Sequence, residues 1–543
     1  MAITFLKQAI NTYESVRNDN QALSQEFKEY YITTIEKDYR NLSGLLLQEN
    51  RILEAQQVLD LLKIQELDDY LRGVRGTDSN LSILRAEQAI LEKYDELTTT
   101  AIELSQELSA IREVAEDLRS PTQKQRILTL IDLQADINKQ FRDFSTSPEV
   151  RDLLAQLTPE LQDATVRLSS LNKIETELTD LNAALIYPLI LEDRLEIVVM
   201  LPGGPPLRRT VNGLTSTELN TTILALRQAI DSPSHNPLPA AQQIYDWLIR
   251  PIETDLAQSG VTSLIYAPDG QLRYIPLSAL HNGENWLIET YRINNITAES
   301  LTEFDDLPTA NPRVLAAAFA DTTITHPIEI DGQPRNFSGL PFAGAELDNL
   351  TASQPNITTF RDRDFTLNAI KGVMNEHNIL HFATHAAFVN SNPEDSFILF
   401  GNGDDPTLIA IKDWRLRNVA IVVLRDSETG LDGFGNGAEI LGMGYQFQRS
   451  GAGAVMASLW SVDDRGTQDL MARFYHHLSE GKPKAQALQQ AQLDLITSDG
   501  LIPNADPRGS IVLNTPAATL PENLEGLRHP YYWAPFILIG NGL

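Results

Sequence analysis

The sequence predicts an α-helical module over residues 1–182 and an α/β domain over residues 183–543. In the second part we expect a mostly parallel central sheet with helices on both faces. Two observations predict this organisation. As far as Asn182, apolar residues recur at three- and four-residue steps with few prolines and glycines, which is typical of amphipathic helices. From Ala183 onward, short apolar runs rich in β-branched residues alternate with helical patterns, which is typical of α/β domains.

Residues 1–182 are predicted to form a series of helices. The stretch Leu42–Leu67, broken at Glu49–Arg51, resembles a single tetratricopeptide helix hairpin, although no 34-residue repeat of it follows. Further helices, which we expect to form antiparallel hairpins, are predicted at Leu81–Leu118, Pro121–Phe144 and from Pro148 to about Asn182. We interpret this tetratricopeptide-like module as structural and as the docking site of a protein partner.

The second part alternates between strands and helices. The run Leu195–Leu201 is predicted to be a strand, and a Pro-Gly-rich turn leads from it to a hairpin partner at Arg208–Val211. A helix is predicted around Pro239–Leu256. Later strands are predicted at Leu264–Ala267, Val314–Ala317, Ile379–Ala383, Phe397–Phe400, Ala420–Leu424, Ala454–Leu459 and Phe536–Ile539.

Composition narrows the classes of function. The net charge of -30, from 73 acidic and 43 basic residues, repels phosphate backbones and argues against a nucleic-acid partner. No apolar segment is long enough to span a membrane, and we do not expect the amino-terminal residues to form a signal peptide. The chain contains no cysteine, so it has neither disulfides nor thiolate metal sites. We therefore expect a cytoplasmic protein without a membrane partner.

Two apolar runs end in residues that can carry chemistry. Asn378–Phe388 contains His385, and Ile421–Gly430 contains Ser427. Active sites of parallel sheets lie beyond the carboxyl ends of the strands, so we expect these two residues at one edge of the sheet. An imidazole beside a hydroxyl predicts nucleophilic chemistry at this edge.

Several separate motifs now identify a family. HFATHAAF at His381–Phe388 resembles the histidine motif of the CHAT family, whose caspase-like domains are often preceded by tetratricopeptide repeats. Similar likenesses are found in four other segments: Ala267–Leu280, Gly451–Asp464, Leu470–Ile496 and His529–Gly542. The resemblance covers nearly all of the chain from about Ala183 onward. It implies a caspase-like fold, a Cys-His endopeptidase mechanism and a protein or peptide substrate.

The chain departs from the family pattern at the nucleophile. The pattern there reads roughly Leu-Ser-Ala-Cys-Glu-Thr-Gly, so Ser427 stands in the position of the catalytic cysteine, and Arg425 and Asp426 replace small neighbours. Caspase-type enzymes place histidine about 50 residues before the nucleophile, and 42 residues separate His385 from Ser427 here. Because a serine hydroxyl ionises far less readily than a thiol, we expect a peptidase scaffold that is inactive as written. The alternative is a non-catalytic adaptor, and the serine is compatible with natural divergence or with engineering.

Four further residues are predicted to bind substrate. The carboxylates of Asp426, Asp463 and Asp464 could attract a basic side chain, and Trp460 could form an apolar wall. Asp463 and Asp464 could equally cap the helix that begins near Arg465.

No metal or cofactor is expected. His381 and His385 would suggest a zinc pair on a helix, but on a strand they lie roughly 13 Å apart at 3.3 Å per residue. The sequence Gly433–Ala438 fits G-x-G-x-x-A, yet it begins nine residues past Leu424, too late for a dinucleotide site. We interpret it as a loop beside the active site. The pair His476–His477 is expected on the exposed side of an amphipathic helix.

Overall fold

The computed structural model divides the chain into two compact units. The first comprises Met1–Val58 and Asp78–Asn172, and the second comprises Leu59–Thr77 and Lys173–Leu543. Residues 20–24, 72–79, 116–117, 168–175, 303, 305–311, 331, 391, 430–433, 462–463, 498–525 and 543 are not described, and residues 16–19, 25–34, 69, 158–167, 300, 426–429 and 464–465 are described by their backbone alone.

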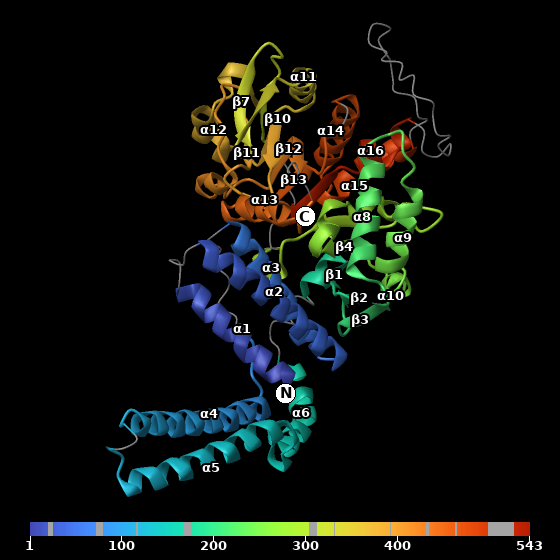
Figure 1. The fold of residues 1–543 in the computed structure, drawn as a ribbon. Coiled ribbons are helices and arrows are strands. Elements are labelled where there is room, and N and C mark those ends of the chain that lie inside the picture. Colours follow the sequence, from blue (N-terminus) through green and yellow to red (C-terminus); the bar gives the residue numbers. More distant parts are fainter. Residues whose placement is uncertain are drawn as a thin grey trace. The chain divides into compact units, whose positions relative to one another are not determined.

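The helical unit is built of antiparallel helices (Figure 1). The expected break at Glu49–Arg51 is confirmed, because one helix ends at Gln48 and the next begins at Ile52, with Asn50 between them at a φ of 57°. A small core of Ile90, Phe144 and Val150 joins the later helices. Its helices are α1 (Ala2–Asp19), α2 (Gln25–Gln48), the part of α3 (Ile52–Leu71) as far as Val58, α4 (Arg85–Arg112), α5 (Pro121–Asp143) and α6 (Pro148–Arg167).

A buried group of charges stabilises the helical unit. The ammonium of Lys7 is 1% exposed and lies 3.0 Å from Glu87, and it donates to the Ser82 carbonyl at 2.9 Å. Arg51 forms ion pairs with both Glu54 and Glu87. Burial disfavours the charged form of Glu54, but the hydrogen bond from Arg51 and the charge of Lys7 outweigh this and lower its pKa. The buried charges are therefore paired rather than isolated.

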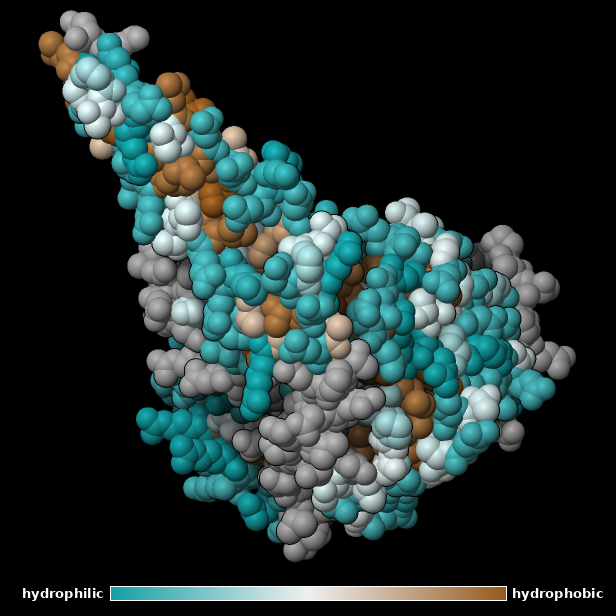
Figure 2. Space-filling view, turned by 90° about the horizontal axis from the view of Figure 1, so that it is seen from below, coloured by the Kyte–Doolittle hydropathy of each residue, from teal (hydrophilic) through white to brown (hydrophobic). Residues whose placement is uncertain are grey.

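The hairpin of α4 and α5 presents apolar side chains to solvent. Figure 2 shows hydrophobic residues gathered along its length. The large side chains that are more than a third exposed include Ile102, Leu118, Leu128, Ile131 and Leu133. An apolar stripe of this kind is typical of surfaces that bind another protein.

The second unit contains a 12-stranded sheet among the described residues. Its strand order is β3-β2-β1-β4-β5-β14-β13-β12-β10-β6-β9, and β11 pairs with β10. From β1 to β9 the neighbours are parallel except at β13–β14, so the predicted mostly parallel sheet is confirmed. The strands are β1 (Ala183–Ile190), β2 (Arg194–Met200), β3 (Leu207–Asn212), β4 (Ser263–Tyr266), β5 (Arg292–Asn295), β6 (Val314–Ala318), β9 (Ile357–Arg361), β10 (Ile379–Phe388), β11 (Phe397–Ile398), β12 (Ile421–Thr429), β13 (Ala454–Ser458) and β14 (Phe536–Gly540).

Helices cover both faces of this sheet, as expected. Successive residues of a strand point to opposite faces, and β10 illustrates this with His381 and Phe382. His381 contacts Glu346 of α11 and Tyr475 of α14, whereas Phe382 packs on Trp414, which in turn contacts α13. The helices are α8 (Ser216–Ile230), α9 (Leu238–Leu248), α10 (Glu253–Ser259), α11 (Ala343–Ser353), α12 (Leu367–Val373), α13 (Ala438–Arg449), α14 (Asp464–Ser479), α15 (Lys484–Thr497) and α16 (Pro530–Trp533). A separate hairpin is formed by β7 (Thr325–Ile330) and β8 (Gln333–Ser338).

The second half of α3 packs within the α/β unit, although its residues precede that unit by more than a hundred positions. The ammonium of Lys63 donates to the Pro268 carbonyl at 2.6 Å. The Tyr70 hydroxyl donates to the Val389 carbonyl, immediately after β10, at 2.7 Å. This helix therefore holds the loop that follows the histidine strand. None of the helices in the described part of the chain carries an apolar run long enough to cross a membrane.

His529 is expected to make the α/β unit less stable in mild acid. Its Nε2 donates to the His235 carbonyl and its Nδ1 accepts from Tyr531, and burial lowers the pKa of the imidazole to about 4. The pKa in the unfolded chain is about 6.5, so only the unfolded state gains a proton between these values. Stability from His529 is complete above pH 6.5, and about 3 kcal/mol is lost as the pH falls to 4.

Denaturant unfolding at pH 7 and pH 5, followed by tryptophan fluorescence, tests this expectation. All five tryptophans belong to the α/β unit, so the signal reports on that unit. The variant His529→Asn keeps an acceptor for the Tyr531 amide but does not titrate, and it should lose less stability than the wild type. Equal losses in both proteins would contradict the assignment.

Candidate active site

His385 lies near the carboxyl end of β10, where two other strands meet it. The strand is buried along its length except at this residue, which is partly exposed. On one side β12 runs parallel to it, and on the other side the short strand β11 pairs with it in the antiparallel direction. The Leu399 amide donates to the His385 carbonyl at 2.9 Å. The backbone of His385 is therefore fixed from both sides while its ring reaches solvent.

The β7–β8 hairpin sets the tautomer of His385. The Nε2 atom lies 2.8 Å from the backbone carbonyl of Ser338, the last residue of β8. A carbonyl oxygen only accepts, so Nε2 must carry the proton. In the neutral ring Nδ1 is then the atom with a lone pair, which is the form that a general base requires. The Phe337 ring packs against the imidazole with centroids 5.3 Å apart.

The strand register places the position of Ser427 next to the histidine. In the parallel pairing of β10 with β12, Asp426 is opposite His385 and Ser427 is opposite Ala386. The register shifts between Phe382 and His385, so the two strands are irregular just before the site. Neighbouring strands lie about 4.8 Å apart, and the backbones of these residues are therefore adjacent. The side chains of residues 426–429 lie outside the described residues.

The other predicted binding residues are less completely described. Trp460 lies two residues past the end of β13 and is 4% exposed, with the Arg227 guanidinium 4.7 Å above its ring. Asp464 is the first residue of α14, close to the start expected at Arg465, and its side chain lies outside the description. Asp463 lies outside the described residues altogether.

A buried ionic network supports the strand that carries Ser427. Arg425, two residues before the serine, places its Nε 2.5 Å from the Glu346 carboxylate. The other Glu346 oxygen is 3.1 Å from His381 Nε2, and the His381 Nδ1 lies 3.0 Å from the Tyr475 hydroxyl. Burial first, and then the Glu346 charge, raise the pKa of Tyr475 well above its usual value. The interpretation of His381 as a core histidine agrees with these contacts, and Arg425 is a structural residue.

The glycine-rich segment before α13 owes its composition to close packing. A Cβ on Gly435 would lie 2.2 Å from the Asn390 side chain, and Gly437 adopts a φ of 76° with Arg273 pressed against it. The Tyr274 hydroxyl accepts from the Gly435 amide at 3.0 Å, and Arg273 donates to the Asn436 carbonyl at 2.7 Å. The first glycine of the motif, Gly433, lies outside the described residues. Close packing against Asn390 therefore explains Gly435, and the positive φ together with close packing against Arg273 explains Gly437.

A cavity that the sequence interpretation missed lies near these residues. Its volume is about 280 Å³, and it is lined by Ile223, Leu224, Arg227, Gln271, Tyr274 and Phe434. A signal for it was present in the sequence: α8 has apolar residues on one face, and Arg227 occupies a position on that face. A charged residue at a core position of a helix indicates a specific partner.

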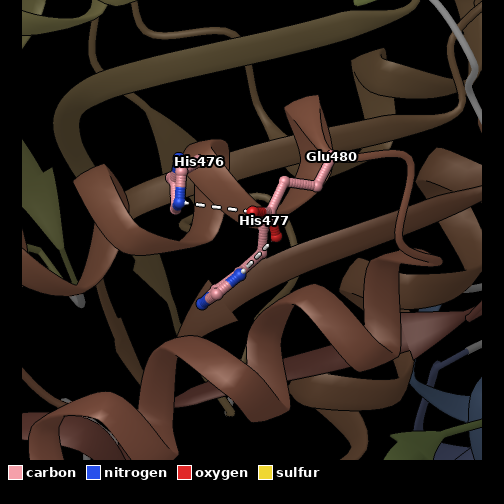
Figure 3. A group of neighbouring side chains, drawn as sticks. All are labelled: His476, His477 and Glu480. Carbon is pink, nitrogen blue, oxygen red and sulfur yellow. Dashed lines mark hydrogen bonds and ion pairs between the residues drawn. The ribbon is translucent and has the colours of Figure 1, made fainter.

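One group of side chains has the composition of a metal site. His476, His477 and Glu480 bring ligand atoms within 4.8 Å of one another (Figure 3). The expectation that both histidines are exposed is wrong for His477, which is 9% exposed because its Nε2 meets Asp494 of α15 at 2.9 Å. The Lys482 ammonium lies 3.0 Å from His477 Nδ1 and pairs with Glu480. A cation thus already neutralises the carboxylate of this group.

Comparison with known proteins identifies the domain. The family described as CHAT domain matches residues 238–541, which is more than half of the chain. The chain belongs to the CHAT domain family. The family predicted from the sequence motifs is thereby confirmed. The matched region includes His385, Ser427 and the buried ionic network around Glu346. A search of curated proteins found no match to the chain.

Solved structures give distant likenesses. A chain of the Saccharomyces cerevisiae separase–securin complex is 9% identical to this chain, with a TM-score of 0.42. The match covers 90% of this chain and 37% of the separase-complex chain. A second structure of the same complex gives 10% identity and a TM-score of 0.41. The complex of Porphyromonas gingivalis RgpB pro- and mature domains gives 11% identity and a TM-score of 0.32. The match covers 60% of this chain and 76% of the chain from that complex. The chain spans little more than a third of the length of the separase-complex chain.

Proposed function

We propose that this CHAT domain is the scaffold of a Cys-His endopeptidase that binds a segment of another protein and does not cut it, because Ser427 replaces the nucleophilic cysteine. The observation that carries the proposal is the register of β10 and β12. It sets the position of residue 427 beside Ala386, next to His385, at the carboxyl edge of the sheet. Membership of the CHAT domain family supports the same reading.

With cysteine at position 427, the residues present could perform amide hydrolysis. The thiolate would attack the peptide carbonyl carbon, and backbone N–H groups would stabilise the oxyanion. As the C–N bond breaks, the protonated His385 ring would give its proton to the leaving amine. Water would then hydrolyse the thioester, with the same ring accepting a proton. The Ser338 carbonyl keeps the other ring nitrogen oriented throughout.

A serine in the same position needs more assistance than a cysteine. A hydroxyl requires a base in hydrogen-bond contact, and that base is normally oriented by a carboxylate that stabilises the imidazolium. Here the group on Nε2 is a neutral carbonyl, which orients the ring but supplies no negative charge. We therefore expect the serine protein to bind peptides without cleaving them.

The experiment compares the full-length wild type with Ser427→Cys on a peptide library, read by mass spectrometry. We expect cleaved products with the cysteine variant alone, because the thiol supplies a few per cent of thiolate near neutral pH. Cleavage by the wild type would contradict the proposed inactivity. A folded cysteine variant that cleaves no peptide would contradict the peptidase scaffold.

A second candidate function is that of an adaptor whose α/β domain performs no chemistry. It is favoured by the apolar stripe on the α4–α5 hairpin, which includes Ile102, Leu128 and Ile131. In that case the helical unit would bind the partner, and Ser427→Cys would remain inactive while partner binding persisted. The cleavage experiment therefore separates the two functions.

A further inference from the structure

The Arg227 guanidinium is buried and only partly paired. Its exposed fraction is 5%, and its Nη2 donates to the Leu459 carbonyl at 2.7 Å. Among the residues that the structure describes, its Nε and Nη1 donors have no hydrogen-bond partner. Burial lowers the pKa of Arg227 to about 10, an effect that the Asp231 charge offsets only in part, so the group is still a cation at neutral pH.

A buried cation with unused hydrogen-bond donors lowers the stability of a protein unless an anion accepts from those donors. Leaving a buried charged donor unsatisfied costs several kcal/mol, and proteins normally pair such groups. The Trp460 ring, 4.7 Å from the guanidinium, supplies a cation–π contact but no acceptor for the remaining N–H groups. The complementary ligand is therefore an anionic oxygen, and among the side chains of a protein segment a carboxylate matches the planar guanidinium.

The cavity has the form of a pocket for one side chain. Arg227 lies at its buried end, while Leu224 and Phe434, which are 38% and 39% exposed, form an apolar rim. Tyr274 packs edge-on against Phe434 with centroids 4.7 Å apart. An apolar entrance with a cation at its end fits a side chain with a short methylene stem and a carboxylate.

The pocket borders the same sheet edge as the candidate active site. Leu459, which holds Arg227, directly follows β13, and β13 pairs in parallel with β12. The Ser458 hydroxyl donates to the Arg425 carbonyl at 3.3 Å, which continues this contact toward Ser427. Phe434 belongs to the segment between β12 and α13. Leu459 and Phe434 therefore both follow strands that end at this edge.

We propose that the Arg227 cavity is a specificity pocket of the peptide-binding site and that it takes the carboxylate of an aspartate or glutamate in the bound protein segment. The inference rests on the proposed function, since it names a substrate class for the same site. It differs from the expectation drawn from Asp426, Asp463 and Asp464, which favoured a basic side chain.

The test measures peptide binding to the full-length wild type, which does not consume its ligand. Fluorescein-labelled hexapeptide pools, each with one fixed residue at one position, are titrated by fluorescence polarisation. The fixed residues are aspartate, asparagine, glutamate, glutamine, arginine, lysine and leucine. At one position the acidic pools should bind about tenfold or more tightly than their amide counterparts, because hydrogen bonds to a charged group are the strong ones.

Two variants and a matched control assign this preference to the pocket. Arg227→Met should abolish the difference between acid and amide pools while the leucine pool still binds. Gln271→Glu adds a negative charge at a partly exposed cavity position and should do the same without removing a buried group. Arg250→Met removes a surface charge that pairs with Asp246 and Glu253, and it should leave the preference unchanged. Circular dichroism verifies the fold of each variant.

The possible outcomes separate this inference from the proposed function. If no pool binds the wild type, both fall together. If pools bind without a preference for acids, or prefer arginine and lysine, the pocket assignment falls and the peptide-binding scaffold stands. An acidic preference that persists in a folded Arg227→Met or in Gln271→Glu also overturns the assignment.

Discussion

In the Ser427→Cys background, His385→Ala should lower the rate of peptide cleavage by about 10²–10⁴-fold, the usual contribution of a positioned acid–base group. The physical reason is the departure of the amine, which is a poor leaving group without a proton. The His385 ring is held for this task by the Ser338 carbonyl and the Phe337 ring. Initial rates on the best library peptide, compared between the single and the double variant, give the effect.

The matched control for His385 is another histidine. His476→Ala, also in the Ser427→Cys background, removes an imidazole that is 66% exposed and belongs to α14. It should leave the rate within about twofold, since surface substitutions change stability little. A His385→Ala variant that is folded and retains the full rate would remove His385 from the mechanism.

Glu346→Ala should destabilise the α/β unit by about 3–5 kcal/mol, the usual cost of breaking a buried ion pair by removing one partner. The carboxylate is 3% exposed and lies between His381 and Arg425. Its removal leaves Arg425, which is 2% exposed, without the carboxylate that its Nε contacts. Denaturant unfolding followed by tryptophan fluorescence measures the change, since every tryptophan belongs to this unit.

Two further variants test whether the loss of stability comes from the buried charge of Arg425. The double variant Glu346→Leu with Arg425→Leu removes both charges and should recover most of the lost stability, because apolar replacements of buried pairs are often nearly neutral. The exposed Glu284→Ala serves as the control and should change stability by less than about 0.5 kcal/mol. A double variant as unstable as the single one would assign the cost to lost packing instead.

The sequence alone predicted several parts of this protein correctly. Its local patterns carry the information: helical spacing broken at Glu49–Arg51, and apolar runs that form buried strands. The starts of β10 and β12 were expected to within one residue because their apolar runs are β-branched, whereas both strands continue five residues past the expected carboxyl ends. The CHAT family followed from separate motifs, and the roles assigned to His385 and Ser427 stay predictions.

Elements stabilised by distant parts of the chain were not predictable in this way. The β8 strand, with the sequence QPRNFS, and the β5 strand, RINN, have no apolar run, so their extended form depends on hydrogen bonds to other strands. The expected single helix at Pro239–Leu256 is two helices, α9 and α10, interrupted around Pro251. Proline lacks the N–H that a continuous helix requires.

The sequence by itself determined the mostly parallel sheet, the CHAT family and the strands on which His385 and Ser427 lie, because these depend on local periodicity and on short motifs. Only the tertiary structure decided which groups from distant parts of the chain lie around the candidate site and the cavity. The tautomer of His385 depends on the carbonyl of Ser338, and the charge at the end of the pocket is that of Arg227, far away in sequence. The Ser338 carbonyl and Arg227 reach their positions through the packing of the sheet and its helices. The sequence pattern around each residue does not show which distant residue it contacts.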